Sequence, residues 1–115
     1  MVHAGFYEYL GRIWEQVEAY INTPARKKKA LYNCGHSLGG AIGILFATKL
    51  QHENKNIKSV YTFGSPPLCC NKFSQYYQDR GLYSRTYRYT TPRDPVTHLV
   101  PFFKHVGNEI ILPYN

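Results

Sequence analysis

No stretch of this 115-residue chain is apolar enough to cross a membrane. The longest run of apolar residues and glycine, 38–47, is about half of the roughly 20 residues that a transmembrane helix needs. Residues 1–8 contain neither a basic region nor an apolar one, so no secretory signal is visible. The sequence therefore predicts no transmembrane helix and shows no route for export.

Cysteine is scarce as well. The three cysteines are an odd number, and Cys69 and Cys70 are adjacent, which excludes a closed disulfide framework. Cys34 lies in a segment that is predicted to be a buried strand. These features favour a reducing compartment, so the cytoplasm is the expected location.

Acidic residues are few: 7 Asp and Glu stand against 14 Lys and Arg, which leaves a net charge of +7. This charge attracts acidic surfaces, whether anionic lipid or nucleic acid, and does not choose between them. Low-complexity tracts are absent, and the 43% hydrophobic and 16% aromatic content excludes a disordered chain. A chain of this length builds one hydrophobic core, so we expect a single domain over residues 1–115.

Apolar periodicity predicts alternating helices and strands. Between Phe6 and Ile21 the large apolar residues recur at the spacing of an amphipathic helix. A second helix, starting at Ser37, is apolar on nearly every side and should be largely buried. This order of elements is typical of an α/β fold with a mostly parallel sheet flanked by helices. The predicted elements are helix 6–21, strand 30–34, helix 37 to about 52, strand 57–63, helix 71–79, and strands 83–90 and 106–112.

The segment Gly35-His36-Ser37-Leu38-Gly39-Gly40 contains a G-x-S-x-G motif where a predicted strand turns directly into a predicted helix. In this context the motif is typical of a nucleophile elbow, in which the glycines allow a sharp turn that exposes the serine hydroxyl. Ser37 is the candidate nucleophile, and the Leu38 amide is the candidate half of an oxyanion hole. The alternative is that Ser37 serves only as a helix N-cap.

A nucleophilic serine needs a base that takes its proton and a carboxylate that orients the base. The chain has two aspartates, and Asp79 ends a polar helix where a solvated surface charge is expected. Asp94 follows a strand, sits between Pro92 and Pro95, and comes after Ser37 as the acid does in α/β-hydrolases. We predict Asp94 as the acid, with a loop-capping aspartate as the alternative.

Taken together, these segments resemble the class 3, fungal-type triacylglycerol lipases of the α/β-hydrolase superfamily. The resemblance implies a truncated α/β-hydrolase core, with an elbow at Ser37, that hydrolyses lipid carboxylic esters. It also implies a lipid ester as substrate, Asp94 as triad acid, and neither a metal nor an organic cofactor. The matching segments are Val2–Phe6, Gly35–Ala41, Tyr61–Pro66, Tyr87–Arg88, Arg93–Val96 and Lys104–Ile110.

The family places its catalytic histidine downstream of the segment that resembles Lys104–Ile110, and its first strands before the segment that resembles Val2–Phe6. We therefore expect a domain that is incomplete at both ends relative to the family. Among the histidines present, His105 is the first candidate for a substitute base and His98 the second, because both follow Asp94. The alternative function is a catalytically inactive core or fragment that binds lipid or protein.

Further expectations concern the remaining histidines and the partners. His36 should pack or hydrogen-bond behind the elbow, His3 should support the site, and His52 should face solvent. A sheet without its first strands exposes an edge that can pair with another chain, which predicts a homo-oligomer. Peripheral contact with a lipid surface is expected, and nucleic acid is not, because the tyrosines follow core periodicity.

Overall fold

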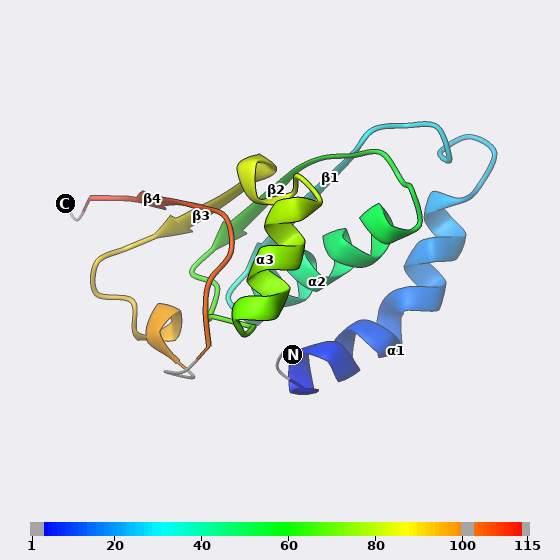
Figure 1. Ribbon diagram of the computed structural model, residues 1–115. Coiled ribbons are helices and arrows are strands. Elements are labelled where there is room, and N and C mark those ends of the chain that lie inside the picture. Colours follow the sequence, from blue (N-terminus) through cyan, green and yellow to red (C-terminus); the bar gives the residue numbers. More distant parts are fainter. Residues whose placement is uncertain (1–3, 100–102, 114–115) are drawn as a thin grey trace.

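The computed structural model describes residues 4–99 and 103–113, which form a four-stranded sheet with the strand order β1-β2-β3-β4 (Figure 1). All three strand pairs are parallel, because each strand is followed by a crossover segment that returns the chain to the same end of the sheet. This architecture confirms the predicted α/β fold. The strands are β1 (Leu31–His36), β2 (Ile57–Phe63), β3 (Thr86–Thr90) and β4 (Asn108–Ile111).

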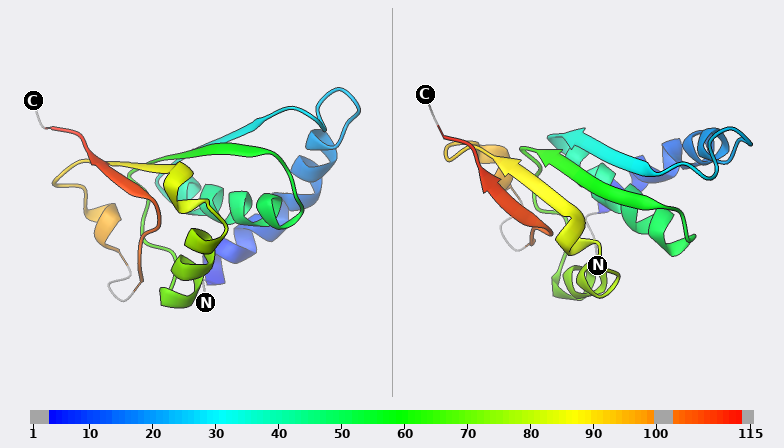
Figure 2. Two further views of the ribbon diagram at one scale, coloured as in Figure 1. Left: turned by 45° about the horizontal axis from the view of Figure 1, so that its top comes forward. Right: turned by 90° about the horizontal axis from the view of Figure 1, so that it is seen from above.

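Three helices lie on one face of this sheet (Figures 1 and 2). They are α1 (Ala4–Ile21), α2 (Leu38–His52) and α3 (Asn71–Asp79), with short 3-10 helices η1 (Tyr83–Arg85) and η2 (Pro95–His98) in the connections. As predicted, α2 is largely buried, and it packs on β1 and β2. The strand predicted to start at residue 83 starts at Thr86, because residues 83–85 form η1.

Helix α1 packs on α2, where the Trp14 ring lies 4.9 Å from that of Phe46. Only part of its predicted apolar stripe is buried: Trp14 is covered, whereas Ile13 and Tyr20 are exposed. Helix α1 therefore extends beyond the sheet rather than lying flat on it. None of the helices in the described ranges is long and apolar enough to span a membrane.

No helix in the described part of the chain covers the other face of the sheet (Figure 2). Aromatic side chains form ladders there: Tyr61 stacks on Tyr87 with ring centroids 5.5 Å apart, and Phe63 stacks on Tyr89 at 5.2 Å. Cys34, predicted to be buried, is exposed because it lies on this same face of β1, at the edge of the sheet.

The tyrosines also depart from the sequence prediction, which treated them as core. Among the described tyrosines only Tyr77 is buried, and Tyr32 is 65% exposed. Alternation in a strand places a residue on one face of a sheet but does not say whether anything covers that face. The core lies instead between the sheet and α2, around residues such as Ile44, Leu50 and Val60.

Candidate active site

Ser37 occupies the sharp turn between β1 and α2, at the carboxyl end of the parallel sheet. Its backbone has φ 54° and ψ −124°, a conformation that costs energy for any residue with a side chain. Its amide donates to the Phe63 carbonyl of β2 over 2.8 Å, which holds the turn against the neighbouring strand. The hydroxyl makes no capping hydrogen bond to α2, which contradicts the alternative that Ser37 is only a side-chain cap.

The glycines around Ser37 differ in whether the fold leaves room for a side chain. A Cβ atom on Gly35 would lie 2.2 Å from the carbonyl oxygen of Gly39, so only glycine fits where β1 meets the first turn of α2. A Cβ atom on Gly40 would lie 2.8 Å from that of Ser65, so this glycine lets α2 approach the chain after β2. Gly39 has open space, so among the described residues packing requires Gly35 and Gly40 rather than Gly39.

The candidate oxyanion donor, Leu38, is the first residue of α2. Amides in the first turn of a helix have no acceptor within the helix, and the helix dipole favours negative charge near them. An oxygen bound beside Ser37 can therefore accept from this amide. Leu38 is 36% exposed and the adjacent Phe63 is 42% exposed, so the surroundings of the turn are apolar.

Asp94 lies in the loop between β3 and η2 and is half-buried. Its Oδ1 accepts from the Val96 amide over 2.9 Å, so one carboxylate oxygen caps η2 as the loop-capping alternative requires. The other oxygen, Oδ2, faces Gly64, where an added Cβ atom would lie only 2.7 Å away. Ser37 and Asp94 therefore flank the same two residues, Phe63 and Gly64, at the end of β2.

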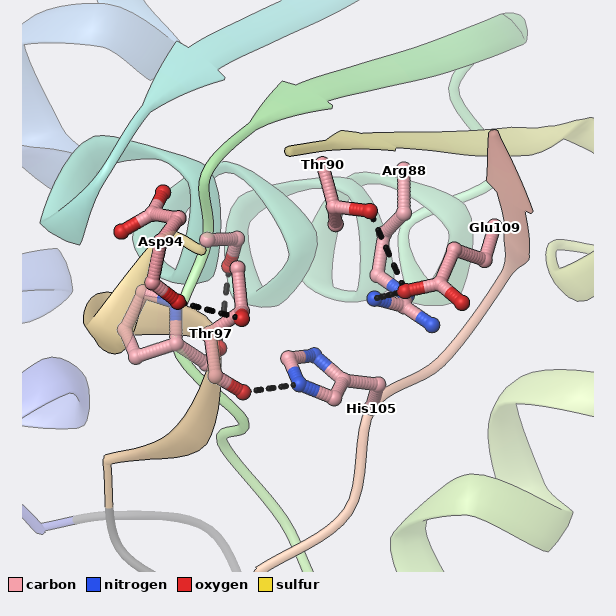
Figure 3. Close-up of polar contacts among 8 residues, drawn as sticks. Arg88, Thr90, Asp94, Thr97, His105 and Glu109 are labelled. Carbon is pink, nitrogen blue, oxygen red and sulfur yellow. Dashed lines mark hydrogen bonds and ion pairs between the residues drawn. The ribbon is translucent and has the colours of Figure 1, made fainter. Parts of the chain in front are cut away.

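His105 lies on the far side of η2 from the Asp94 carboxylate, with Thr97 between them (Figure 3). Its Nε2 is 2.7 Å from the Thr97 carbonyl oxygen, and its Nδ1 is buried without a partner. Burial and the positive charge of Arg88 lower the pKa of His105. Within residues 4–99 and 103–113 no hydrogen bond joins His105 to Ser37 or Asp94.

The other histidines are not brought to Ser37 by any hydrogen bond in the described ranges. His98 ends η2 and is exposed. His36 is exposed at the end of β1, so it does not pack behind the elbow as predicted. His52 faces solvent as expected, and His3 lies outside the described residues. Asp79 is exposed and bonded to Gln75, which agrees with a surface charge.

A family model described as "Lipase (class 3)" matches residues 1–104. The chain belongs to the class 3 lipase family. Its fold agrees with solved lipases: lipase II from Rhizopus niveus superposes with a TM-score of 0.81 at 28% identity, covering 96% of this chain and 44% of that one. The triacylglyceride lipase of Rhizomucor miehei also gives a TM-score of 0.81, at 30% identity and the same coverage of both chains.

Curated relatives give the same family. The chain is 31% identical to a lipase of Rhizomucor miehei, with 94% of this chain and 32% of that protein aligned. It is 32% identical to secreted mono- and diacylglycerol lipase 1 of Fusarium solani, with 94% of this chain and 33% of that protein aligned. This class 3 lipase chain therefore spans about a third of the length of these relatives.

Arg88 is a site neighbour that the sequence analysis did not assign a role. It lies on the helix-covered face of β3, is 8% exposed, and forms an ion pair with Glu109 of β4 at 3.5 Å. Glu109 also accepts from the Thr90 hydroxyl over 3.2 Å. The sequence signal was the alternation of β3, which puts Arg88 on the face opposite Tyr87 and Tyr89.

Proposed function

We propose that this chain carries the nucleophile and the acid of a serine-dependent hydrolase of lipid carboxylic esters. The observation that carries the proposal is the backbone of Ser37, held at positive φ with a hydroxyl that makes no cap. A non-glycine residue in this region is strained, and such strain collects at functional sites. Membership of the class 3 lipase family supports the same reaction.

In the proposed reaction the Ser37 hydroxyl oxygen attacks the ester carbonyl carbon while a general base takes the hydroxyl proton. The Leu38 amide donates to the oxyanion of the tetrahedral intermediate. The base then protonates the leaving alcohol as the ester C–O bond breaks, and water hydrolyses the acyl-serine by the same steps. Asp94 uses Oδ1 to cap η2, which leaves Oδ2 to orient the base.

The general base requires a histidine that can reach the Ser37 hydroxyl. The sequence prediction of His105 would require Nε2 to exchange the Thr97 carbonyl for the Ser37 hydroxyl. His98 is exposed and lies on the turn that Asp94 caps. His105 can serve as the base only if its ring leaves Thr97, so the fluorophosphonate labelling of a His105→Gln variant separates a role as base from a role in holding Thr97.

Exposed apolar side chains at this end of the sheet support a lipid ester as the substrate. Leu38, Phe63 and Leu99 are exposed apolar side chains on segments that follow or end at the carboxyl end of the sheet. The basic segment 26–29 precedes β1 and lies at the opposite end of that strand. Contact with a lipid surface at the site would therefore rest on apolar side chains rather than on the basic segment.

The second candidate function is a catalytically inactive lipase-like core that binds lipid or protein. The observation that favours it is the hydrogen bonding of the described histidines, none of which bonds to Ser37 or Asp94. Without a base, a serine enzyme keeps only the weak catalysis of its oxyanion hole and its binding energy. The two candidates therefore differ by orders of magnitude in turnover.

Labelling with a fluorophosphonate, followed by peptide mapping, distinguishes these candidates. Ser37→Ala is the control for the site, and Asp94→Asn tests the acid because it keeps the shape and loses the charge. Labelling of Ser37 that falls in the Asp94→Asn variant supports the hydrolase. A folded chain that is not labelled, and that floats with neutral phosphatidylcholine vesicles, supports the inactive lipid-binding core.

We further propose that a second copy of this chain pairs with β1. Within the described ranges no strand occupies the outer edge of β1, and an apolar groove of about 560 Å³ runs along it. Antiparallel pairing keeps the two basic segments 26–29 at opposite ends of the joined strands, whereas parallel pairing would bring them together. The groove is lined by residues of α1, β1 and α2, among them Ile13, Val17, Tyr32, Asn33, Gly39 and Phe46.

Light scattering after size-exclusion chromatography tests this pairing. The Ser37 amide points toward β2. Because backbone groups alternate along a strand, the amide and carbonyl of Cys34 point toward the free edge. Cys34→Pro removes the backbone amide hydrogen that would bond to the second copy, and an edge strand tolerates proline at such a position. Cys34→Ser keeps that amide and is the matched control. We expect a dimer that Cys34→Pro converts to a monomer and Cys34→Ser does not. A monomer in all three samples contradicts the pairing.

A further inference from the structure

The turn that carries Asp94 is held from behind by a polar contact that the sequence did not predict. Thr97 is 6% exposed, and its hydroxyl donates to the Asp94 carbonyl over 2.9 Å. The Thr97 carbonyl lies 2.7 Å from Nε2 of His105, which comes from the segment before β4 (Figure 3). Asp94 and His105 are thus joined through one buried residue.

The chemistry of this contact sets the proton on the ring. A backbone carbonyl only accepts hydrogen bonds, so Nε2 must carry a proton and donate it to Thr97. In the neutral ring Nδ1 is then a bare acceptor. Because Nδ1 is buried and has no partner in the described structure, protonating it would bury an unpaired donor.

The net effect of burial and of the charged groups around the ring also favours the unprotonated Nδ1. Arg88 of β3 and Glu109 of β4 lie on the side of the ring away from Thr97 (Figure 3), and His98 of η2 is the third titratable neighbour. Burial and the charges of Arg88 and His98 lower the pKa of His105, against the opposite effects of the Thr97 carbonyl and Glu109. The net effect favours a neutral imidazole.

We propose that His105 is a positioning residue, a neutral imidazole whose Nε2–H holds the Thr97 carbonyl and so fixes the turn that presents Asp94. This inference rests on the proposed function, in which Asp94 is the acid. It differs from the sequence prediction, since a ring that donates to Thr97 cannot at the same time accept the proton of Ser37 at that nitrogen. Hydrogen bonds join His105 to Thr97 and Thr97 to the Asp94 carbonyl, and the Arg88–Glu109 ion pair lies on the other side of the ring.

Histidine-selective nitrogen NMR on the folded chain tests the tautomer without any turnover. His105 is assigned as the signal that His105→Gln removes. We expect the neutral tautomer with the proton on Nε2 at pH 7, and a pKa below the ordinary value near 6.5. A proton on Nδ1 at neutral pH, or titration at or above 6.5, would overturn the proposal.

Substitutions of the two charged neighbours test whether electrostatics holds the ring neutral. Glu109→Gln should lower the pKa of His105 further, because Glu109 raises it. Arg88→Gln should raise it, because the positive charge is removed. Glu109 is 44% exposed and should tolerate the change even if the buried Arg88 does not. Glu109→Gln without an effect on the titration contradicts this part of the argument.

Hydrogen exchange measures the positioning itself. The Val96 amide donates to Oδ1 of Asp94, so its exchange rate reports how well the carboxylate is held. His105→Phe fills the space without a donor, and we expect about fivefold faster exchange at Val96, the factor for one ordinary hydrogen bond. His105→Gln keeps an amide donor and should recover part of the protection. If the Val96 amide exchanged at the rate of the unchanged chain in both variants, the positioning role would be refuted.

Two controls separate this result from general destabilisation and from catalysis. The Gly40 amide donates to the Ser37 carbonyl at the elbow and should exchange at an unchanged rate in both variants. Fluorophosphonate labelling of Ser37 is measured separately. Unlabelled Ser37 with normal NMR behaviour would count against the proposed hydrolase and leave the positioning contact intact.

Discussion

The two candidate catalytic residues are held by different kinds of structure. Ser37 sits in a turn that six consecutive residues, 35–40, build largely by themselves, with one amide bonded to β2. Asp94 sits in a turn that Val96 and Thr97 cap locally and that distant segments also support: Gly64 after β2 and His105 before β4. A site can therefore combine a locally encoded nucleophile with an acid that depends on tertiary contacts.

The largest expected effect comes from disrupting the locally built turn that carries Ser37. Gly35→Ala places a methyl group 2.2 Å from the Gly39 carbonyl oxygen, so we expect a loss of about 3 kcal/mol in the free energy of unfolding. Gly39→Ala is the matched control in the same motif, because nothing lies within 4 Å of its Cβ position. It should be neutral or stabilising by up to about 1 kcal/mol. Urea unfolding measures both, and equal effects would contradict the assignment of the two glycines.

The second prediction tests the contact between the Asp94 turn and the distant residue Gly64. This residue has φ +62°, and its added Cβ atom would lie 2.7 Å from Oδ2 of Asp94. We expect Gly64→Ala to cost about 1–2 kcal/mol for the left-handed backbone, and to displace the Asp94 carboxylate. Gly43→Ala, in open space on α2, is the control for a glycine change alone. Unchanged thermal unfolding and unchanged Val96 exchange in Gly64→Ala would show that the carboxylate does not lie against Gly64.

The pH dependence of stability sharpens the comparison, because a titrating group supports only the Asp94 turn. The pKa of His105 is lowered in the folded chain, so the unfolded chain binds this proton more readily. The contribution is fully present above about pH 6.5 and is lost as the pH falls below that value. Urea unfolding between pH 7.5 and 5 should show this decrease, and His105→Gln should reduce it. The same slope in both proteins would assign the decrease to other groups.

The smallest effect is chemical and leaves stability unchanged. Cys34 lies exposed on the strand that leads to Ser37, whereas Cys69 is buried and burial raises its pKa to about 12. Iodoacetamide at pH 8 should modify Cys34 in the folded chain well before Cys69, as read by peptide mapping. Comparable rates at the two cysteines would mean that β1 is covered or that Cys69 is accessible.

The predictable and unpredictable parts of the fold follow the range of the interactions. Periodicity located α1, α2, β2 and α3 closely, because their buried residues recur within each element. It could not show that no helix of the described residues covers one face of the sheet, and for that reason the predictions of a buried Cys34 and of tyrosines in the core were wrong. The alternation predicts strand for residues 83–85, but these residues form η1, which contacts other segments through the hydrogen bond from Arg85 to the Ile57 carbonyl.

The sequence by itself determined the elbow and the family, because the G-x-S-x-G motif, its position between a strand and a helix, and the order of Ser37 and Asp94 are all read along the chain. Tertiary structure alone decided what His105 does. Its place after Asp94 is compatible with a base, but the ring lies against the Thr97 carbonyl and beside Arg88. The partner of a histidine nitrogen is chosen by folding, because protonation and hydrogen bonding depend on burial and neighbouring charge rather than on sequence order.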